Sequence, residues 1–434
     1  MEVKTREIYK DDFAEYLLCL ALDVGEGMLK NGGEVGRVED TIERICRAYG
    51  AQHVEVFTIV SMITAAVRMP DGSYSSQLRR VKQTGNDLGM LESLNAISRE
   101  ICRTTPELDE VDRRLQEIKS RRPYPVWLSL LASAVGASAF CLFFGGDILD
   151  ALITFVIGAI IYCVINFSSA RLSAMARTVI SSFIASAMAA VLSMMIPTLG
   201  VDYIIIGAIM LLVPGLMFAT AMRDLFCGDL IAGTLKILQT LLQVLMIGFG
   251  YMLAYELFID STASSVVADA KEVFIVQLIT AAITSVAFAL VFKTGKRHLV
   301  AIGIAGTFTF AVYFGIAQLS DSYFLAAFIS SAVAAVFSEV NARLRKAPAL
   351  VVLMPAVISI VPGGYLYRAA RDFIQGKMSS GVEELSHAAA IALGLASGIV
   401  VAAIIFGMTH DMVKKIKNKK KANKTSQNDE LCAK

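Results

Sequence analysis

Two stretches of the sequence, 213-VPGLMFATAMRDLFCG-228 and 361-VPGGYLYRAARDFIQG-376, decide the organisation of the whole chain. At an offset of 148 residues they agree at seven of sixteen positions, in the pattern VPG-x5-A-x-RD-x3-G. Similarity at a fixed offset indicates internal repeats. The sequence therefore predicts two related halves, each with one copy of this motif.

The composition around the two motifs is that of a membrane protein. Hydrophobic residues make up 56% of the 434 residues before the 31 glycines are counted, whereas soluble chains reach about 45–50% with glycine included. Only 18% of the residues are charged, against about 25% in a soluble chain. Because so little polar surface cannot cover a water-soluble globule of this length, we expect a polytopic α-helical membrane protein.

The charges are distributed unevenly along the chain. Residues 1–125 contain 39 charged residues with a net charge of −3, whereas residues 126–410 contain only 28. A short basic tail follows from residue 411. The acidic head and the total charge of +2 argue against nucleic-acid binding, which requires a concentrated basic face.

The charged head has the pattern of a small α+β domain. Apolar residues at helical spacing predict an amphipathic helix from Phe13 to Met28, and a second helix follows the Gly32-Gly33 interruption. The remaining predicted elements are strands at 53–60, 62–69 and near 74–82, a turn at 70–72, and helices near 87–103 and 107–120. No residues in the head are arranged like a nucleophile with its base.

Beyond the head, apolar runs alternate with short polar breaks. Each run is close to the roughly 20 residues that an α-helix needs to cross the hydrocarbon core. We predict ten spans, at residues 126–144, 148–166, 178–196, 201–222, 235–258, 273–292, 299–318, 322–341, 348–368 and 386–408.

Basic loops orient these spans, because cytoplasmic loops are enriched in Lys and Arg. One side collects the basic residues Lys119, Arg121, Arg122, Arg171, Arg177, Arg223, Lys236, Lys293, Lys296, Arg297, Arg343, Arg345, Lys346 and the tail. The other side has only Lys271 before the ninth loop, which holds Arg368, Arg371 and Lys377. We therefore expect cytoplasmic N- and C-termini in a plasma-membrane protein, with the ninth loop as an exception.

The repeat explains this exception. Since each half has five spans, an odd number, the second half must enter the membrane upside down, which is the plan of many secondary transporters. Arg371 then lies at the external end of span 9 because its counterpart Arg223 lies at the cytoplasmic end of span 4. The predicted domains are the cytosolic head (1–122), two five-helix inverted repeats (123–260 and 261–410) and a basic cytosolic tail (411–434).

The motif also predicts where a substrate binds. Proline inside a span breaks or kinks the helix, and the half-helix that follows presents free N–H groups and a positive dipole end to a carboxylate. We expect a midplane site formed by Pro214, Gly215, Pro362, Gly363 and Gly364. The pairs Arg223-Asp224 and Arg371-Asp372 are expected to gate its two sides.

Simpler interpretations of the same residues stay open. Kinked membrane helices are common, an Arg near a helix C-terminus complements the helix dipole, and shared ancestry alone could preserve both copies. Glu256 and Glu339 are either interfacial residues or proton-coupling groups. Seven scattered cysteines and four histidines form no CxxC or HExxH motif, so we expect no metal site, cofactor or enzymatic centre. A membrane-anchored ligand sensor is the remaining alternative to a transporter.

The chain carries the motif Gly33-Glu34-Val35-x-Arg37-Val38-Glu39-Asp40-Thr41 near its start and the VPG…RD…G helix further on. Through these residues it resembles the threonine/serine exporter (ThrE) family over almost its whole length. The first motif is similar to the opening motif of that family. The turn at Asp71-Gly72, the Tyr124-Pro125-x-Trp127 segment and the VPG…RD…G helix are similar too. The last five spans resemble a partner domain that some relatives carry as a separate chain, and here both are fused.

The resemblance implies export of small hydrophilic metabolites, notably threonine and serine, driven by the proton gradient. In two-chain relatives the implied substrate is a dicarboxylate such as succinate, which is the alternative for this chain. Both substrate classes carry a carboxylate and suit the half-helix argument. The expected partners are the small-molecule substrate, protons as the coupling ion and the lipid bilayer; a homo-oligomer is left open by the sequence.

Overall fold

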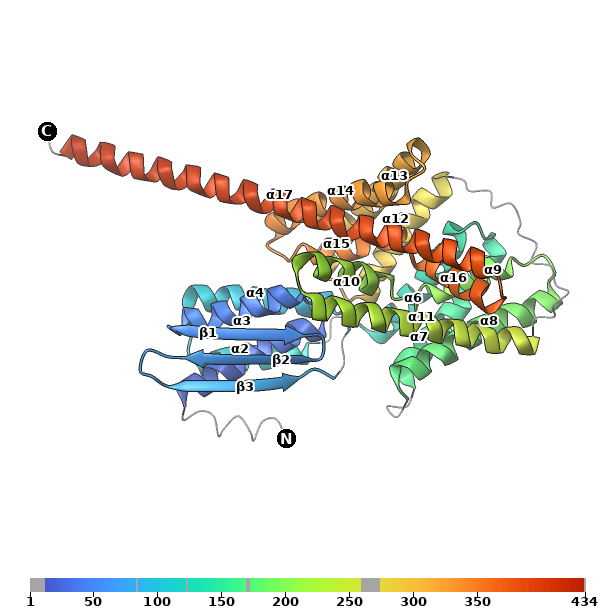
Figure 1. Ribbon diagram of the computed structural model, residues 1–434, viewed down its shortest axis with the longest axis horizontal. Coiled ribbons are helices and arrows are strands. Elements are labelled where there is room, and N and C mark those ends of the chain that lie inside the picture. Colours follow the sequence, from blue (N-terminus) through green and yellow to red (C-terminus); the bar gives the residue numbers. More distant parts are fainter. Residues whose placement is uncertain (1–11, 83–84, 122–123, 169–171, 259–273, 433–434) are drawn as a thin grey trace.

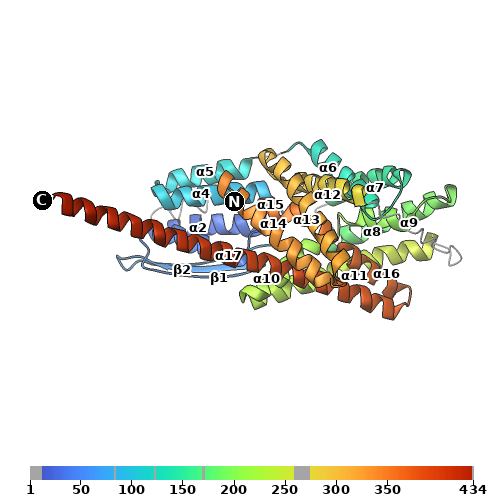
Figure 2. The ribbon, with the colours of Figure 1, turned by 90° about the horizontal axis from the view of Figure 1, so that it is seen from above.

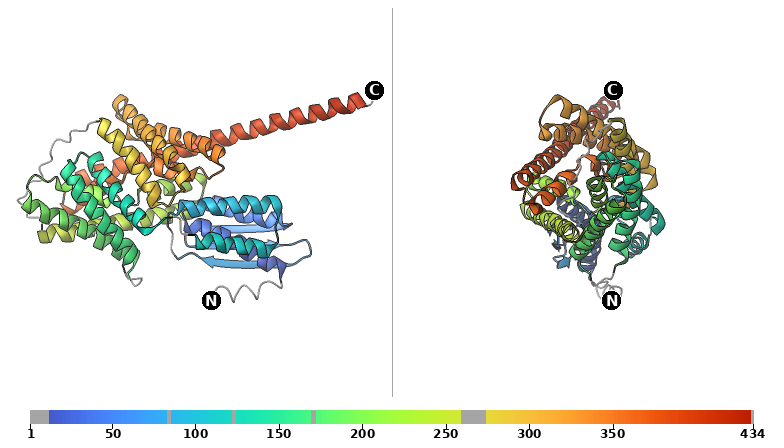
Figure 3. Two further views of the ribbon diagram at one scale, coloured as in Figure 1. Left: turned by 180° about the vertical axis from the view of Figure 1, so that it is seen from behind. Right: turned by 90° about the vertical axis from the view of Figure 1, so that its right-hand side faces the viewer.

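The computed structural model describes residues 12–82, 85–121, 124–168, 172–258 and 274–432 of the chain, and it is elongated, with a strand-containing head at one end and packed helices at the other (Figure 1). The expected domain boundaries at 122/123 and 260/261 lie outside these residues, as do Arg122, Arg171 and Lys271. Figures 2 and 3 show the same end-to-end arrangement from other sides.

The described part of the head contains four helices and one antiparallel sheet. Its elements are α2 (Phe13–Lys30), α3 (Val35–Ala48), β1 (His53–Ile59), β2 (Met62–Arg68), β3 (Tyr74–Arg80), α4 (Leu88–Thr104) and α5 (Leu108–Ser120). The strands lie in the order β1-β2-β3, and Arg68 pairs with Tyr74 across a turn in which Gly72 has a φ of +88°.

Alternation along β2 explains which face of the sheet is covered. Ile63, Ala65 and Val67 are buried, because every second side chain of a strand points to the same face, and α2 and α3 pack on that face. Helix α2 is the centre of the head, with nearly all its apolar side chains buried. Asp12 caps its start by accepting from the backbone N–H of Ala14 at 2.9 Å.

The rest of the chain is helical and consistent with a polytopic membrane protein. Its helices are α6 (Val126–Phe143), α7 (Ile148–Phe167), α8 (Ala174–Met195), α9 (Val201–Ile209), α10 (Gly215–Cys227), α11 (Leu230–Phe258), α12 (Phe274–Val291), α13 (Leu299–Leu319), α14 (Tyr323–Arg345), α15 (Leu350–Ala356), α16 (Gly363–Ile374) and α17 (Met378–Cys432). Short 3-10 turns η1 (Lys296–His298) and η2 (Ile358–Ile360) precede α13 and follow α15. In the described ranges, eight helices are long and apolar enough to cross a membrane, or nine if the α15–α16 pair, bent by 41°, is one span.

The difference from the expected ten spans lies in the fourth. Residues 201–222 are divided between α9 and α10, neither of which is long enough by itself to cross a bilayer. The break at Met210–Pro214 is five residues long. A second difference is at the C-terminal end, where α17 runs through the expected start of the tail at residue 411 and ends at Cys432.

The helix boundaries follow the offset of 148 residues. Shifted by this amount, α6 (126–143) coincides with α12 (274–291), and the start of α11 at Leu230 coincides with the start of α17 at Met378. The intervening helices correspond to within a few residues. Packing is matched as well, since α11 packs on α8 and α10 as α17 packs on α14 and α16.

Candidate functional site

The two VPG motifs adopt the same local structure. Pro214 precedes α10 with φ −81° and ψ 40°, and Pro362 precedes α16 with φ −74° and ψ 33°. Each proline carbonyl accepts the first backbone bond of its helix, from Phe218 at 3.0 Å and from Leu366 at 3.1 Å. Proline suits this position because its fixed φ fits the helix start and its missing N–H would be unpaired there anyway.

The two helix starts lie against each other. A Cβ added to Gly215 would lie 2.0 Å from Cγ1 of Val361, and one added to Gly363 would lie 3.1 Å from Cγ1 of Val213. Gly364 faces the ring of Phe144, the residue that follows α6, at 3.1 Å from a built Cβ. The structure therefore brings together Pro214, Gly215, Pro362, Gly363 and Gly364, the residues that the sequence predicted as a binding site.

A polar side chain lies at each of the two helix breaks. Gln243 on α11 donates to the carbonyl of Leu212, in the gap between α9 and α10, at 2.7 Å. Ser359 in η2, just before the second motif, is 8% exposed and its Oγ has no hydrogen-bond partner. Breaking a helix frees carbonyls and N–H groups that must find partners or meet a ligand.

Arg223 ends the first motif on the side of the head. This residue is 8% exposed, and its Nη1 lies 2.5 Å from Oε1 of Glu34 on the loop before α3. Its Nη2 is 3.6 Å from Oδ1 of Asp224, whose other oxygen lies 2.5 Å from Nζ of Lys236 on α11. Two cations and two carboxylates thus form one cluster between the head and the helices.

Arg371 ends the second motif away from the head. Its Nη1 lies 3.4 Å from Oδ2 of Asp202 at the start of α9, and its Nη2 lies 3.0 Å from Oδ1 of Asp372. The other oxygen of Asp372 accepts from Ser380 Oγ at 2.6 Å. The Arg-Asp pair is the same as in the first motif, but the partners around it differ.

The helices that follow the two motifs also end alike. Gly228 and Gly376 have φ values of +95° and +75°. Asp229 donates to the carbonyl of Asp224 at 2.9 Å, and the equivalent Lys377 donates to that of Asp372 at 2.8 Å. The chain turns back at both glycines, because glycine reaches positive φ without steric cost.

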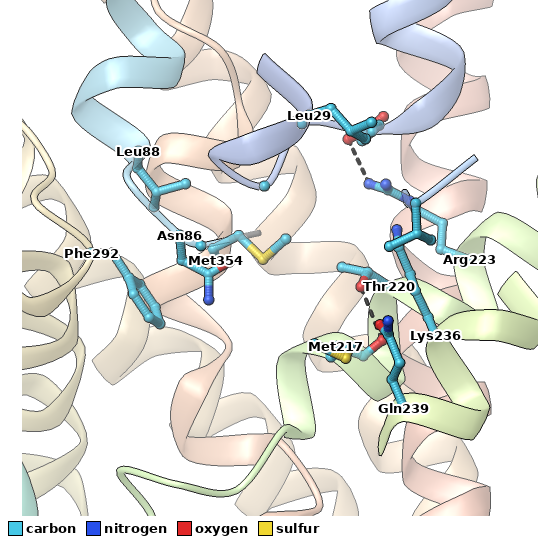
Figure 4. Close-up of a pocket in the computed structure, with 15 residues that line it drawn as sticks. Leu29, Asn86, Leu88, Met217, Thr220, Arg223, Lys236, Gln239, Phe292 and Met354 are labelled. Atoms are coloured by element: carbon cyan, nitrogen blue, oxygen red, sulfur yellow. Dashed lines mark hydrogen bonds and ion pairs between the residues drawn. The ribbon is translucent and has the colours of Figure 1, made fainter. Parts of the chain in front are cut away.

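A cavity lies where the head meets the Arg223 cluster (Figure 4). It has a volume of about 130 Å³. One wall is the face of α10 that carries Met217, Thr220 and Arg223 at a spacing of three residues. The other lining residues come from the head and from further helices: Leu29, Gly32, Gly33, Glu34, Val60, Gly85, Asn86, Leu88, Lys236, Gln239, Phe292 and Met354.

Helix α4 of the head is docked on the turn between α12 and α13. Leu88 donates to the carbonyl of Phe292 at 2.8 Å, and Glu92 contacts both Arg297 and His298. Burial raises the pKa of Glu92, but the hydrogen bonds from His298 and Arg297 outweigh it and hold that pKa below its ordinary value. The head therefore rests on the side of the helices that carries the basic loops.

The expected proton-coupling residues lie elsewhere. Glu256 is exposed near the end of α11, and Glu339 is half-buried on α14. Neither lines the cavity. Within the described parts of the chain, no group of three or more His, Cys, Asp or Glu side chains is placed to hold a metal ion.

Sequence reasoning missed the partners of the two arginines. The sequence identified Glu34 only as part of a family motif and Lys236 only as a basic loop residue that indicates orientation. It gave no role to Asp202. The available signal was weak: an acidic residue directly after Gly32-Gly33, and another at the start of span 4.

Two family models match the chain. The model described as "Putative threonine/serine exporter" matches residues 19–258, and the model described as "Threonine/Serine exporter, ThrE" matches residues 277–405. Together they cover the head and both sets of helices.

Three curated proteins illustrate the similarity. The "Probable threonine/serine exporter" of Mycobacterium tuberculosis is 22% identical over 89% of this chain and 75% of its own length. The "Threonine/serine exporter" of Corynebacterium glutamicum is 23% identical over 89% of this chain and 81% of its own length. The "Probable succinate transporter subunit YjjP" of Klebsiella aerogenes is 24% identical, over 48% of this chain and 80% of its own length. No solved structure matches the chain.

Proposed function

The chain belongs to the threonine/serine exporter family, and we propose that it is a secondary active transporter that exports threonine and serine, coupled to protons. The two relatives named for these amino acids cover 89% of the chain. The relative named for succinate covers only 48%. A dicarboxylate substrate is therefore less well supported.

The observation that carries this proposal is the contact between the two helix breaks. Gly215 of the first motif lies against Val361 of the second, and Gly363 lies against Val213. Exchange of partners between equivalent positions is what a two-fold relation between the halves would produce. We propose that residues 123–260 and 261–410 are inverted repeats of five spans each, giving ten spans with α9–α10 and α15–α16 as broken ones.

The proposed substrate site lies at these breaks, between the Arg223-Asp224 and Arg371-Asp372 gates. The free N–H groups at the starts of α10 and α16 suit the carboxylate of an amino acid. Helices α10 and α16 extend from the contact in opposite directions, one toward the head and one toward Asp202 (Figure 1). Each gate would then close one side of the site.

The proposed topology places the head (1–122) and the tail (411–434) in the cytoplasm, with the transporter in the plasma membrane. Docking of the head beside Lys293, Arg297 and Lys346 supports this orientation, because these residues belong to the basic loops. Glu256 and Glu339 stay the candidates for proton coupling.

Flux measurements test this function. Purified protein is reconstituted in liposomes, and labelled threonine, serine and succinate are followed with and without a pH gradient. We expect threonine and serine flux that increases with the gradient, and little succinate flux. Absence of flux for all three compounds would remove the substrate assignment.

Single substitutions test the gates. Arg223→Gln and Arg371→Gln should each reduce threonine flux at least tenfold without preventing membrane insertion. Normal flux in both variants would contradict the gating role of these residues.

A further inference from the structure

The loop that carries Glu34 has a fixed shape. Gly32 has a φ of +88°, and a Cβ on Gly33 would lie 2.7 Å from the carbonyl oxygen of Met28. The carbonyl of Lys30 accepts from Gly85 at 2.6 Å, so a second loop holds the first. Both glycines are required for the chain to leave α2 in this direction and deliver Glu34 to the cavity.

Glu34 supplies the carboxylate that lies nearest to Arg223. Among the described residues of the helical part, Asp224 is the carboxylate in ion-pair contact with Arg223 and Lys236, and Asp229 acts on both cations at longer range. Lys236 lies closer to Asp224, at 2.5 Å, than Arg223 does, at 3.6 Å. A guanidinium that is 8% exposed requires a paired anion, so removal of Glu34 leaves a place for another carboxylate.

The cavity offers that place. Glu34, Arg223 and Lys236 all line it, together with the hydroxyl of Thr220 and the amide of Gln239 (Figure 4). These groups suit a small molecule that carries one carboxylate and further hydrogen-bonding groups. Met217, also on the lining face of α10, is two residues after Gly215 at the helix break.

We propose that Glu34 occupies the position of a substrate carboxylate on Arg223, and that the head is the inner gate of the transporter. A substrate entering from the side of the head displaces Glu34, and the loop at 32–34 moves away from α10. This inference rests on the proposed function and adds to it the role of the head. The opposite gate needs no head, because Arg371 pairs with Asp202 of the helical part.

The central experiment is Glu34→Gln, which removes the competing carboxylate but keeps the side-chain size. Threonine transport is measured in membrane vesicles of known orientation with substrate on the side of the head. We expect the KM for threonine to fall about tenfold, a change that corresponds to about 1.4 kcal/mol. The reason is that the substrate carboxylate no longer has to displace the carboxylate of Glu34 from Arg223. Threoninol, which lacks the carboxylate, should gain nothing from the substitution.

Two variants serve as controls. Glu43→Gln removes a glutamate of the same head from its pair with Arg47, at 2.7 Å on the surface of α3, and should leave the KM unchanged. Asp202→Asn removes the partner of Arg371 and should lower the KM only for substrate presented on the opposite side. Equal effects of Glu34→Gln from both sides would overturn the inference.

A crosslink tests the movement of the head directly. A Cβ on Gly36 would lie 3.9 Å from Oδ2 of Asp229, so Gly36→Cys with Asp229→Cys joins α3 to the loop between α10 and α11. The exposed Cys227 is replaced by Ser to avoid mispairing. Oxidation should reduce threonine flux at least tenfold, and reduction of the disulfide should restore it. Saturating threonine should slow the formation of the crosslink.

The outcomes separate this inference from the proposed function. If the wild-type protein transports neither threonine nor serine, both the inference and the proposed function are overturned. Normal wild-type flux with an unchanged KM in Glu34→Gln, or undiminished flux through fully crosslinked protein, overturns the inner-gate role of the head and leaves the transporter assignment intact.

Discussion

The contact between the two helix breaks is most directly tested by Gly215→Ala. The added Cβ would lie 2.0 Å from Cγ1 and 3.5 Å from Cβ of Val361, whereas carbon atoms pack optimally at about 3.5–4.0 Å. The two must separate by about 1.5 Å. Val361 cannot easily rotate away because a β-branched side chain is stiff at χ1, and Pro362 restrains the backbone that follows. The helix starts must therefore move apart.

Such overpacking costs about 1–3 kcal/mol of stability. The sign of the effect is informative, because Gly→Ala in a helix is otherwise stabilising by up to about 1 kcal/mol. Gly363→Ala is the matched control, since its nearest contacts are at 3.1 Å and one of them is the adaptable side chain of Met210. We expect its cost to be smaller.

A double-mutant cycle identifies the partner. Val361→Ala removes the clashing Cγ1, so Gly215→Ala combined with Val361→Ala should be more stable than the sum of the single changes predicts, by about 0.5–3 kcal/mol. Equilibrium unfolding in detergent gives the free energies. Additive single effects, or a Gly215→Ala variant as stable as Gly363→Ala, would refute the contact.

Three further predictions concern the head and the ends of the motifs. Because the pKa of Glu92 is lowered, its contribution to head docking is complete above the ordinary value of 4.5 and is lost as the pH falls below that value. Glu92→Gln should therefore remove this acid dependence from unfolding curves measured between pH 3 and 6. Curves unchanged from those of the wild type would contradict this role of Glu92. Gly228→Ala and Gly376→Ala should each cost about 1–2 kcal/mol at their positive φ, while Gly315→Ala, with no atom within 4 Å of a built Cβ, should cost nothing. Asp224→Asn should destabilise by about 3–5 kcal/mol because it leaves Lys236 without its carboxylate, and Asp372→Asn should cost less because its second partner is the neutral Ser380.

Local patterns allowed much of the fold to be predicted from the sequence. The strands at 53–60 and 62–69 and the helix breaks at Pro214 and Pro362 each depend on a few consecutive residues, so a periodicity or a proline is enough to identify them. The count of spans was less reliable. A hydropathy run such as 201–222 is continuous in composition, whereas the break at Met210–Pro214 divides it into two helices.

The repeat extends beyond the two sixteen-residue motifs at 213–228 and 361–376. Gly233 corresponds to Gly381 at the same offset. A built Cβ on Gly233 would lie 2.7 Å from the side chain of Leu225, and one on Gly381 would lie 2.5 Å from that of Phe373, which is the equivalent of Leu225. An eighth identity thus has a packing reason, namely the close crossing of each half-helix with the long helix after it.

The partners of Arg223 and Arg371 could not be predicted from such local patterns. Glu34 and Arg223 are separated by 189 residues, and Asp202 and Arg371 belong to different halves of the chain. Contacts between such distant residues leave no periodicity, and the repeat relation is of no help, because the head that supplies Glu34 has no counterpart in the second half.

These unequal partners give the two proposed gates different charge. Without the head, the two cations Arg223 and Lys236 face the carboxylate of Asp224 in contact and that of Asp229 at longer range, so the inner cluster is close to neutral. The outer cluster of Arg371, Asp372 and Asp202 has one excess negative charge. In the proposed mechanism, departure of Glu34 makes Arg223 available to a substrate carboxylate, whereas the excess negative charge of the outer cluster repels one. We therefore expect a carboxylate to bind more tightly from the side of the head than from the other side, while the gradients of substrate and protons set the net direction of transport.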